Sequence, residues 1–128
     1  MIVLNTANRS FEYVLGGAVT ANQLPFVVNY FSTTREGQTH PNSANGTSNN
    51  TTAVTILAAP LAGEKRSIQA MTVFNADTAS ATATVRLNDN GTTRVIVRVI
   101  LAVNDMLIYT SAAGWFVLDS NGQVKSIA

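Results

Sequence analysis

Four aspartates are the residues best suited to metal chemistry in this chain, and each lies in or beside a predicted turn. They are Asp77, Asp89, Asp105 and Asp119. The run Asp119–Gly122 weakly resembles a calcium-binding loop, but it has no further acidic ligand at the required spacing and no closing glutamate. An aspartate in a turn commonly bonds its own backbone, which accounts for all four. We therefore predict turn-stabilising roles and no metal site.

His40 is the single histidine and the natural candidate for a general base. A base needs an orienting partner and a nucleophile beside it. His40 lies in a polar segment in which no acidic residue is nearer than Glu36, and the chain has no cysteine. Nucleophile-elbow, dinucleotide and phosphate-loop motifs are also missing from the sequence. We predict that the protein is not an enzyme and needs no cofactor.

Three arginines lie on the clearest hairpin of the sequence, whose strands are expected at residues 80–87 and 92–101 with a three-residue loop at 89–91. That register places Val85 opposite Val95, with Leu87 opposite Thr93, and keeps the apolar faces together. It also places Arg86 directly opposite Arg94 on the non-core face.

Directly opposed like charges are destabilising, so the charges of Arg86, Arg94 and Arg98 need an explanation. The arginines can splay into solvent, or pair with an acidic side chain such as Glu64, with an acidic surface of a neighbouring subunit, or with phosphate. Nucleic acid is disfavoured because no aromatic residues interleave with them and the net charge is only +1.

Composition indicates one folded domain, residues 1–128. The chain has 128 residues, 46% of them hydrophobic and only 12% charged, which is unlike a disordered protein. No apolar run approaches the ~20 residues of a transmembrane helix, so we expect no membrane association. The first residues lack a basic region and a long apolar region, so we expect no signal peptide and synthesis in the cytoplasm.

Val, Ile and Thr are abundant and turn residues recur at short intervals, which favours an all-β fold. We predict a single antiparallel β-sandwich or jelly-roll-like domain with at most one short helical turn. Trp115–Leu118 is apolar on both faces, so we expect this strand to be covered on both sides and Trp115 to be buried. Besides the hairpin, strands are expected at residues 2–5, 10–15, 26–31, 52–57, 66–75, 106–110, 115–118 and 123–126.

Two stretches depart from the strand pattern. Residues 32–51 are rich in Ser, Thr, Asn and Gly and are predicted to form a long polar loop. Within residues 1–25, the side chains of Phe11, Tyr13 and Leu15 are strongly apolar and precede two glycines. This segment is either an N-terminal arm that needs a partner to bury it, or simply the first strands of the sandwich.

Three segments together resemble a group of small β-structured virion proteins of tailed bacteriophages. They are Thr72–Ala79, Val85–Arg94 and Gly114–Asp119, and the similarity runs from about Thr52 to Lys125. It extends more loosely to Val19–Pro25. The motifs have no catalytic content and carry over no site residues. The resemblance implies a structural role in the virion, as a capsid cement (decoration) protein or as a head–tail connector or tail-fibre component.

A decoration protein is our first expectation, located in the virion and bound to the major capsid protein or another virion protein. The resemblance also suggests self-association, with a homotrimer favoured over a dimer. A carbohydrate-binding β-sandwich is the alternative from another class, because a Trp on such a fold often stacks on sugars. Candidate assembly-interface residues are Phe11, Tyr13, Leu15, Arg86, Arg94 and Arg98.

Overall fold

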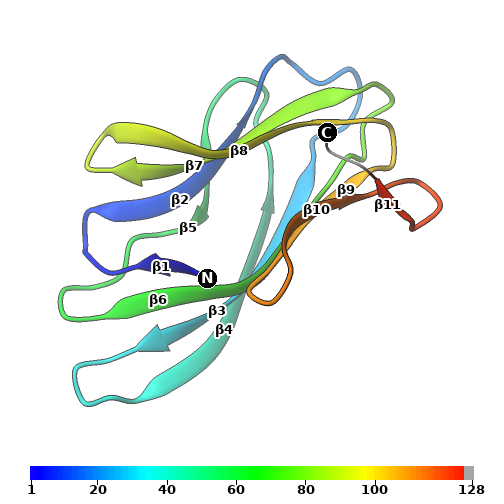
Figure 1. Cartoon of the computed structure of the whole chain (residues 1–128). Helices are drawn as coiled ribbons and strands as arrows, with labels where there is room; N and C mark the ends of the chain where they lie inside the picture. The colour runs from blue at the N-terminus through cyan, green and yellow to red at the C-terminus, as the bar shows by residue number, and fades with distance from the viewer. Residues whose placement is uncertain (126–128) are drawn as a thin grey trace.

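Two antiparallel β-sheets pack face to face in the computed structural model, which describes residues 1–125 (Figure 1). The elements of this part of the chain are strands, without a helix. This confirms the predicted β-sandwich. The alternation of apolar and polar residues explains it, since each sheet has one apolar face that must be buried against the other.

The larger sheet has seven strands. Its order is β11-β10-β9-β6-β3-β4, and β1 pairs with β6 beside β9. All its pairings are antiparallel, and β6 lies at its centre between β3 and β9. The strands are β1 (Ile2–Leu4), β3 (Pro25–Thr33), β4 (Thr39–Thr47), β6 (Lys65–Phe74), β9 (Met106–Thr110), β10 (Gly114–Leu118) and β11 (Val124–Lys125).

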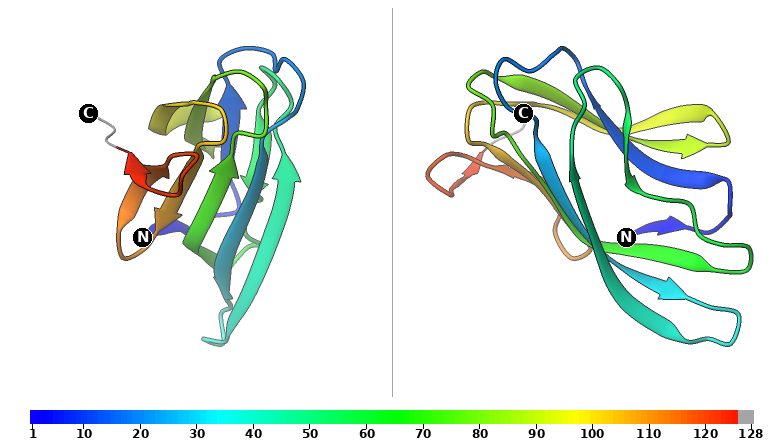
Figure 2. Two further views of the ribbon diagram at one scale, coloured as in Figure 1. Left: turned by 90° about the vertical axis from the view of Figure 1, so that its right-hand side faces the viewer. Right: turned by 180° about the vertical axis from the view of Figure 1, so that it is seen from behind.

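The smaller sheet has four strands in the order β5-β2-β7-β8, with β8 at one edge. They are β2 (Arg9–Leu15), β5 (Val54–Leu57), β7 (Ala81–Asp89) and β8 (Thr92–Leu101). Figure 2 shows from behind how the β7–β8 and β3–β4 hairpins diverge towards their tips. The predicted strand positions are therefore confirmed to within a few residues, apart from β4, which the sequence did not predict. Residue 126, the last of the strand predicted at 123–126, lies outside the described residues.

The N-terminal segment is part of the sandwich and not a free arm. β2 lies between β5 and β7, and its side chains Phe11, Tyr13 and Leu15 are buried at 0%, 0% and 3% exposure. The Tyr13 ring packs edge-on against Phe26 at 5.4 Å between centroids, and so joins the two sheets. The alternative reading, first strands of the sandwich, is the right one, because the chain buries these residues itself.

The long polar loop predicted at residues 32–51 is wrong, because residues 32 and 33 end β3 and the nine residues 39–47 form the edge strand β4. It pairs along its whole length with β3, from Thr39 opposite Thr33 to Thr47 opposite Pro25. Ala44 is the one hydrophobic residue of β4 that packs against the core, and most of the other residues are polar and exposed, so the strand carries no apolar alternation. Pairing with β3 therefore decides its conformation, and polar residues with a proline are typical of an edge strand that resists further pairing.

The β7–β8 hairpin is present, but its loop has two residues instead of three. Asp89 pairs with Thr92, and both Asn90 and Gly91 have positive φ, 52° and 93°. That combination is the type I′ turn whose twist matches a hairpin. The shorter loop moves the register by one residue from the predicted one.

A β-bulge then changes which residues face each other across the hairpin. Arg86 lies opposite Val95 and Leu87 lies opposite Arg94, while Ile96 is the extra residue of β8. Residues directly opposite in a sheet share a face, so Arg86 and Arg94 lie on opposite faces. The predicted Arg86–Arg94 opposition is wrong, and no like-charge pair has to be offset there.

β10 is covered on one face only by residues 1–125. Val117 is buried, and Trp115 is half-buried with its ring 4.9 Å from that of Tyr109. Phe116 and Leu118 point to the other face, outside the sandwich, where they are half-buried. The prediction of coverage on both sides and of a fully buried Trp115 is therefore wrong for the single chain.

Candidate functional site

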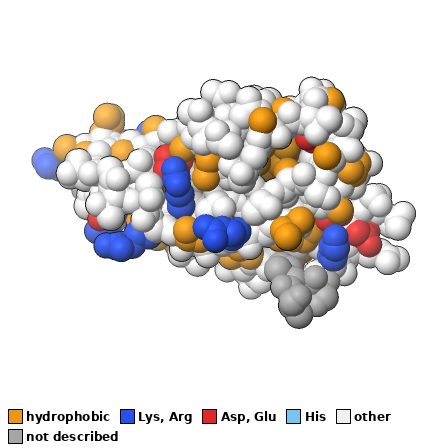
Figure 3. All heavy atoms as spheres, turned by 90° about the horizontal axis from the view of Figure 1, so that it is seen from above, with side chains coloured by type: hydrophobic (Ala, Val, Ile, Leu, Met, Phe, Trp, Pro, Cys, Tyr) orange, Lys and Arg blue, Asp and Glu red, His pale blue; other side chains and the backbone are white. Residues whose placement is uncertain are grey.

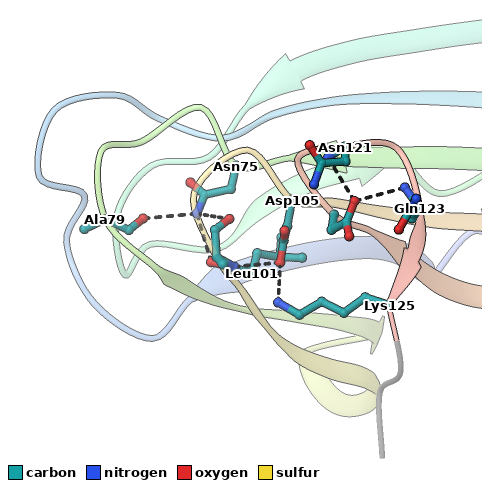
Figure 4. Close-up of polar contacts among 9 residues, drawn as sticks. Asn75, Ala79, Leu101, Asp105, Asn121, Gln123 and Lys125 are labelled. Atoms are coloured by element: carbon teal, nitrogen blue, oxygen red, sulfur yellow. Dashed lines mark hydrogen bonds and ion pairs between the residues drawn. The ribbon is translucent and has the colours of Figure 1, made fainter.

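The densest polar cluster lies at the end of the sandwich where the β6–β7 and β8–β9 loops meet. The buried amide of Asn75 donates to the carbonyl oxygens of Ala79, Leu101 and Ala102 at 2.9–3.1 Å (Figure 4). Its backbone N–H donates to the Asp105 carbonyl. One asparagine thus satisfies carbonyls from two loops, so the cluster holds structure together and offers no free reactive group.

Asp77 joins this cluster to a third loop. Its carboxylate accepts the backbone N–H groups of Thr20 (2.8 Å), Ala21 (2.7 Å) and Asn22 (3.2 Å), and also that of Thr78 (2.8 Å). The N–H of Thr20 is the largest cause that lowers the pKa of Asp77, from its ordinary 3.8 to about 2. Asp77 is thus a charged clamp on the β2–β3 loop, a long-range role that the turn pattern did not reveal.

Asp119 and Asp105 also accept hydrogen bonds from backbone N–H groups near them in the chain. Asp119 accepts the N–H groups of Asn121 and Gln123, and Asp105 accepts that of Ala102 (Figure 4). For these two and for Asp77 the predicted backbone bonding is confirmed. The Asp105 carboxylate is buried and also binds the Lys125 ammonium at 2.9 Å, which attaches β11 to the β8–β9 loop.

Asp89 follows a different pattern from the other three aspartates. Its carboxylate lies 3.5 Å from the Arg9 guanidinium, across the β2–β7 pair. The side chain that bonds the turn is instead Asn88, whose Oδ1 accepts the N–H of Gly91 at 2.8 Å. The prediction that Asp89 serves its own turn is therefore not supported by the contacts.

Arg86 has a partner within the chain that the sequence did not indicate. Its Nε donates to Glu12 Oε1 at 2.7 Å on the outer face of the smaller sheet, where the Glu12 side chain is only 8% exposed. Glu64, the predicted partner, binds Arg66 instead at 3.3 Å. β2 places Glu12 directly opposite Arg86, a pairing that could be seen only once the strand order was known.

Arg94 and Arg98 are the exposed arginines of β8. Arg98 Nε donates to the Thr84 hydroxyl at 3.2 Å, and neither guanidinium has a carboxylate within 4.0 Å in the part of the chain that the structure describes. Ile100 on the same strand is 68% exposed. Figure 3 shows such positive side chains standing among hydrophobic ones. Of the six candidate interface residues, these two arginines remain available to a partner.

The remaining candidates for chemistry are scattered over the described residues. His40 is exposed on β4, opposite Ser32. An open hollow of about 210 Å³ lies between the β3–β4 turn and the loop before β6, lined by residues that include Arg35, Leu61 and Glu64. Within residues 1–125, no group of three or more His, Cys, Asp or Glu side chains is arranged to hold a metal ion. The same residues include no helix long and apolar enough to span a bilayer.

Comparison with known proteins adds no family. No family model matches the chain, and neither the curated proteins nor the solved structures include a match to it.

Proposed function

We propose that this chain is a structural, non-enzymatic protein of a tailed-phage virion, and that it decorates the capsid. The observation that carries the proposal is Arg98 on the outer face of the edge strand β8, beside the exposed apolar side chain of Ile100, with Arg94 exposed near the tip of the β7–β8 hairpin. Such a surface suits contact with an acidic protein surface. The resemblance of Thr72–Ala79, Val85–Arg94 and Gly114–Asp119 to small phage virion proteins supports the choice of partner.

The sandwich supplies the rigidity that such a role needs. Buried polar side chains such as Asn75 and Asp77 bind loop backbone from several parts of the chain. A surface held this firmly loses little conformational entropy when it docks. Arg86 takes no part in docking in this proposal, because Glu12 already neutralises it.

Cosedimentation with virion parts tests the proposal. The full chain is incubated with empty heads and, separately, with tails purified from the phage that encodes it. We expect saturable binding to heads, and weaker binding as salt rises because exposed charges are screened. Arg98→Glu should reduce binding, whereas Lys65→Glu makes the same charge change on an exposed residue of the other sheet and should not.

Other outcomes would redirect the assignment. Binding to tails alone would favour a head–tail connector or tail-fibre component over a decoration protein. Binding to neither part would end the virion proposal. Genes for capsid, portal or protease proteins beside the coding sequence would give independent support for the head.

A further inference from the structure

The central rows on the outer face of the larger sheet carry no charged side chain across five strands, and Lys65 on the same face of β6 lies beyond them. Residues directly opposite each other in an antiparallel sheet share a face, so the register defines continuous rows. One row runs from β4 to β10 through Asn45, Val27, Thr72, Ile108 and Phe116. All five point away from the core, and none is charged.

A second row on the same face is entirely apolar. It is made of Phe74, Met106, Leu118 and Val124, from β6, β9, β10 and β11. Val124 is 71% exposed and, in the first row, Val27 is 46% exposed. Phe116 and Leu118 are half-buried by their own neighbours in the sheet. We call these two rows the apolar face. Figure 2 shows that no other strand of residues 1–125 lies against it.

The sequence of β9 and β10 has the pattern of strands that are covered on both sides. Met106–Tyr109 and Trp115–Leu118 are uninterrupted apolar runs, whereas a strand with one wet face alternates apolar and polar residues. Residues 1–125 cover only the side of Leu107 and Val117. The second cover must therefore come from outside this part of the chain.

The distribution of charge on the two outer faces indicates what covers the apolar face. The outer face of the smaller sheet carries Glu12, Arg86 and Arg98, and any partner for it must match those charges. The apolar face has no charge to match, so two identical copies can meet there without like-charge repulsion. A charged partner surface would instead lose hydration without gaining an ion pair.

The size of the apolar face also fits a second copy. Strands lie about 4.8 Å apart and alternate residues about 6.8 Å apart, and a third uncharged row through Asn29, Ala70 and Thr110 extends the surface. The footprint is then roughly 24 by 20 Å, or about 1,000 Å² for two copies, which reaches the lower limit for a specific interface.

We propose that two copies of this chain pack their apolar faces together about a two-fold axis and form a four-layered dimer. A surface that pairs with itself closes at two copies, so the proposal is a dimer and not the trimer favoured from the sequence. It goes beyond the proposed virion function and does not depend on it. It leaves Arg98 free on the outer face of the smaller sheet, and Arg94 exposed near the tip of the β7–β8 hairpin.

Sedimentation equilibrium of the purified full chain, without any phage component, tests the dimer. We expect a dimer at micromolar concentration. Val27→Glu should raise the dimer dissociation constant by roughly tenfold or more, because each copy would bury an unpaired carboxylate. Val124→Glu should act in the same direction. Both side chains are largely exposed, so the fold should tolerate the change, which circular dichroism can check.

Ile100→Glu is the matched control, since it places the same charge on an exposed residue of the other sheet. It should leave the dimer intact. A monomeric wild type, a trimer, or a dimer that Ile100→Glu disrupts and Val27→Glu spares would each overturn the proposal. A monomer that still binds heads would overturn the dimer alone and leave the virion function standing.

Discussion

Individual polar side chains in this protein connect distant parts of the chain, and their roles become clear only from their partners. Asn75 and Asp77 lie two residues apart in one turn, yet they bind different loops. Asp77 accepts a hydrogen bond from Thr20 of the β2–β3 loop, more than fifty positions earlier, and Asn75 donates one to Ala102 of the β8–β9 loop, more than twenty-five positions later. The sequence indicated that Asp77 belongs to a turn. It gave no sign of the β2–β3 loop, because the donors there are backbone N–H groups, which every residue has.

Asp77→Asn tests the clamp at the residue scale. An amide offers one acceptor oxygen and no charge to the N–H groups that Asp77 now binds, so the variant should melt at a lower temperature at neutral pH. Because folding depresses the pKa of Asp77 from 3.8 to about 2, its contribution is complete above pH ~4 and is lost as pH falls towards 2. The two melting curves should therefore converge in acid.

Asp119→Asn is the matched control, since Asp119 also accepts backbone N–H groups but only within its own turn. Its effect on the melting temperature should be clearly smaller. A constant difference between wild type and Asp77→Asn from neutral pH down to pH 2 would contradict the role of the carboxylate charge.

The Glu12–Arg86 ion pair gives a second residue-scale prediction. Arg86→Ala leaves the nearly buried Glu12 carboxylate without its partner, which should lower the free energy of unfolding by about 2 kcal/mol, less than for a fully buried pair. Arg98→Ala removes an exposed arginine that bonds only a threonine hydroxyl, and it should cost less than about 1 kcal/mol. Chemical denaturation measures both. Equal losses of unfolding free energy in Arg86→Ala and Arg98→Ala would show that the Glu12–Arg86 ion pair adds no stability of its own.

At the scale of elements, the strands that alternate apolar and polar residues could be predicted, and the features without such a signal could not. β7 was placed by Ala83 and Val85, which point to the core. β4 has only Ala44 against the core, and its inner face leaves no room for a side chain at Gly46, where a Cβ would lie 2.9 Å from the Phe26 ring. The bulge at Ile96 arises from the pairing of β7 with β8 and has no local sequence mark.

The hairpin turn supports a prediction at this scale. Gly91 has a φ of 93° with open space around it, so Gly91→Ala is strained only through its backbone. We expect a loss of about 1 kcal/mol in unfolding free energy. Gly17 also has open space but no positive φ, and Gly17→Ala should be neutral or slightly stabilising. Thermal denaturation of the two variants and of wild type compares their stabilities. A Gly91→Ala protein as stable as wild type would contradict the turn assignment.

At the scale of the whole molecule, the two outer faces have different chemistry. The outer face of the smaller sheet has arginines, a partly buried ion pair and hydroxyls, whereas that of the larger sheet is uncharged over its central rows. The face proposed for the dimer could be identified only from the strand order, since β9, β10 and β6 become neighbours through the fold.

Removing residues 1–17 tests whether the N-terminal segment belongs to the core. A free arm could be deleted with the sandwich intact. The structure instead places Phe11 and Tyr13 at the centre of the core and β2 between β5 and β7, with Leu4 of β1 also fully buried. Deletion would remove these side chains and leave facing edges of β5 and β7 without hydrogen-bond partners. We expect the truncated protein to lose its cooperative thermal transition and to aggregate. Circular dichroism and light scattering measure the two effects, with Gly17→Ala, which keeps β2, as the control. A truncated protein that melts cooperatively and has a β-rich spectrum would show that the N-terminal segment is a free arm and that β2 is not needed for folding.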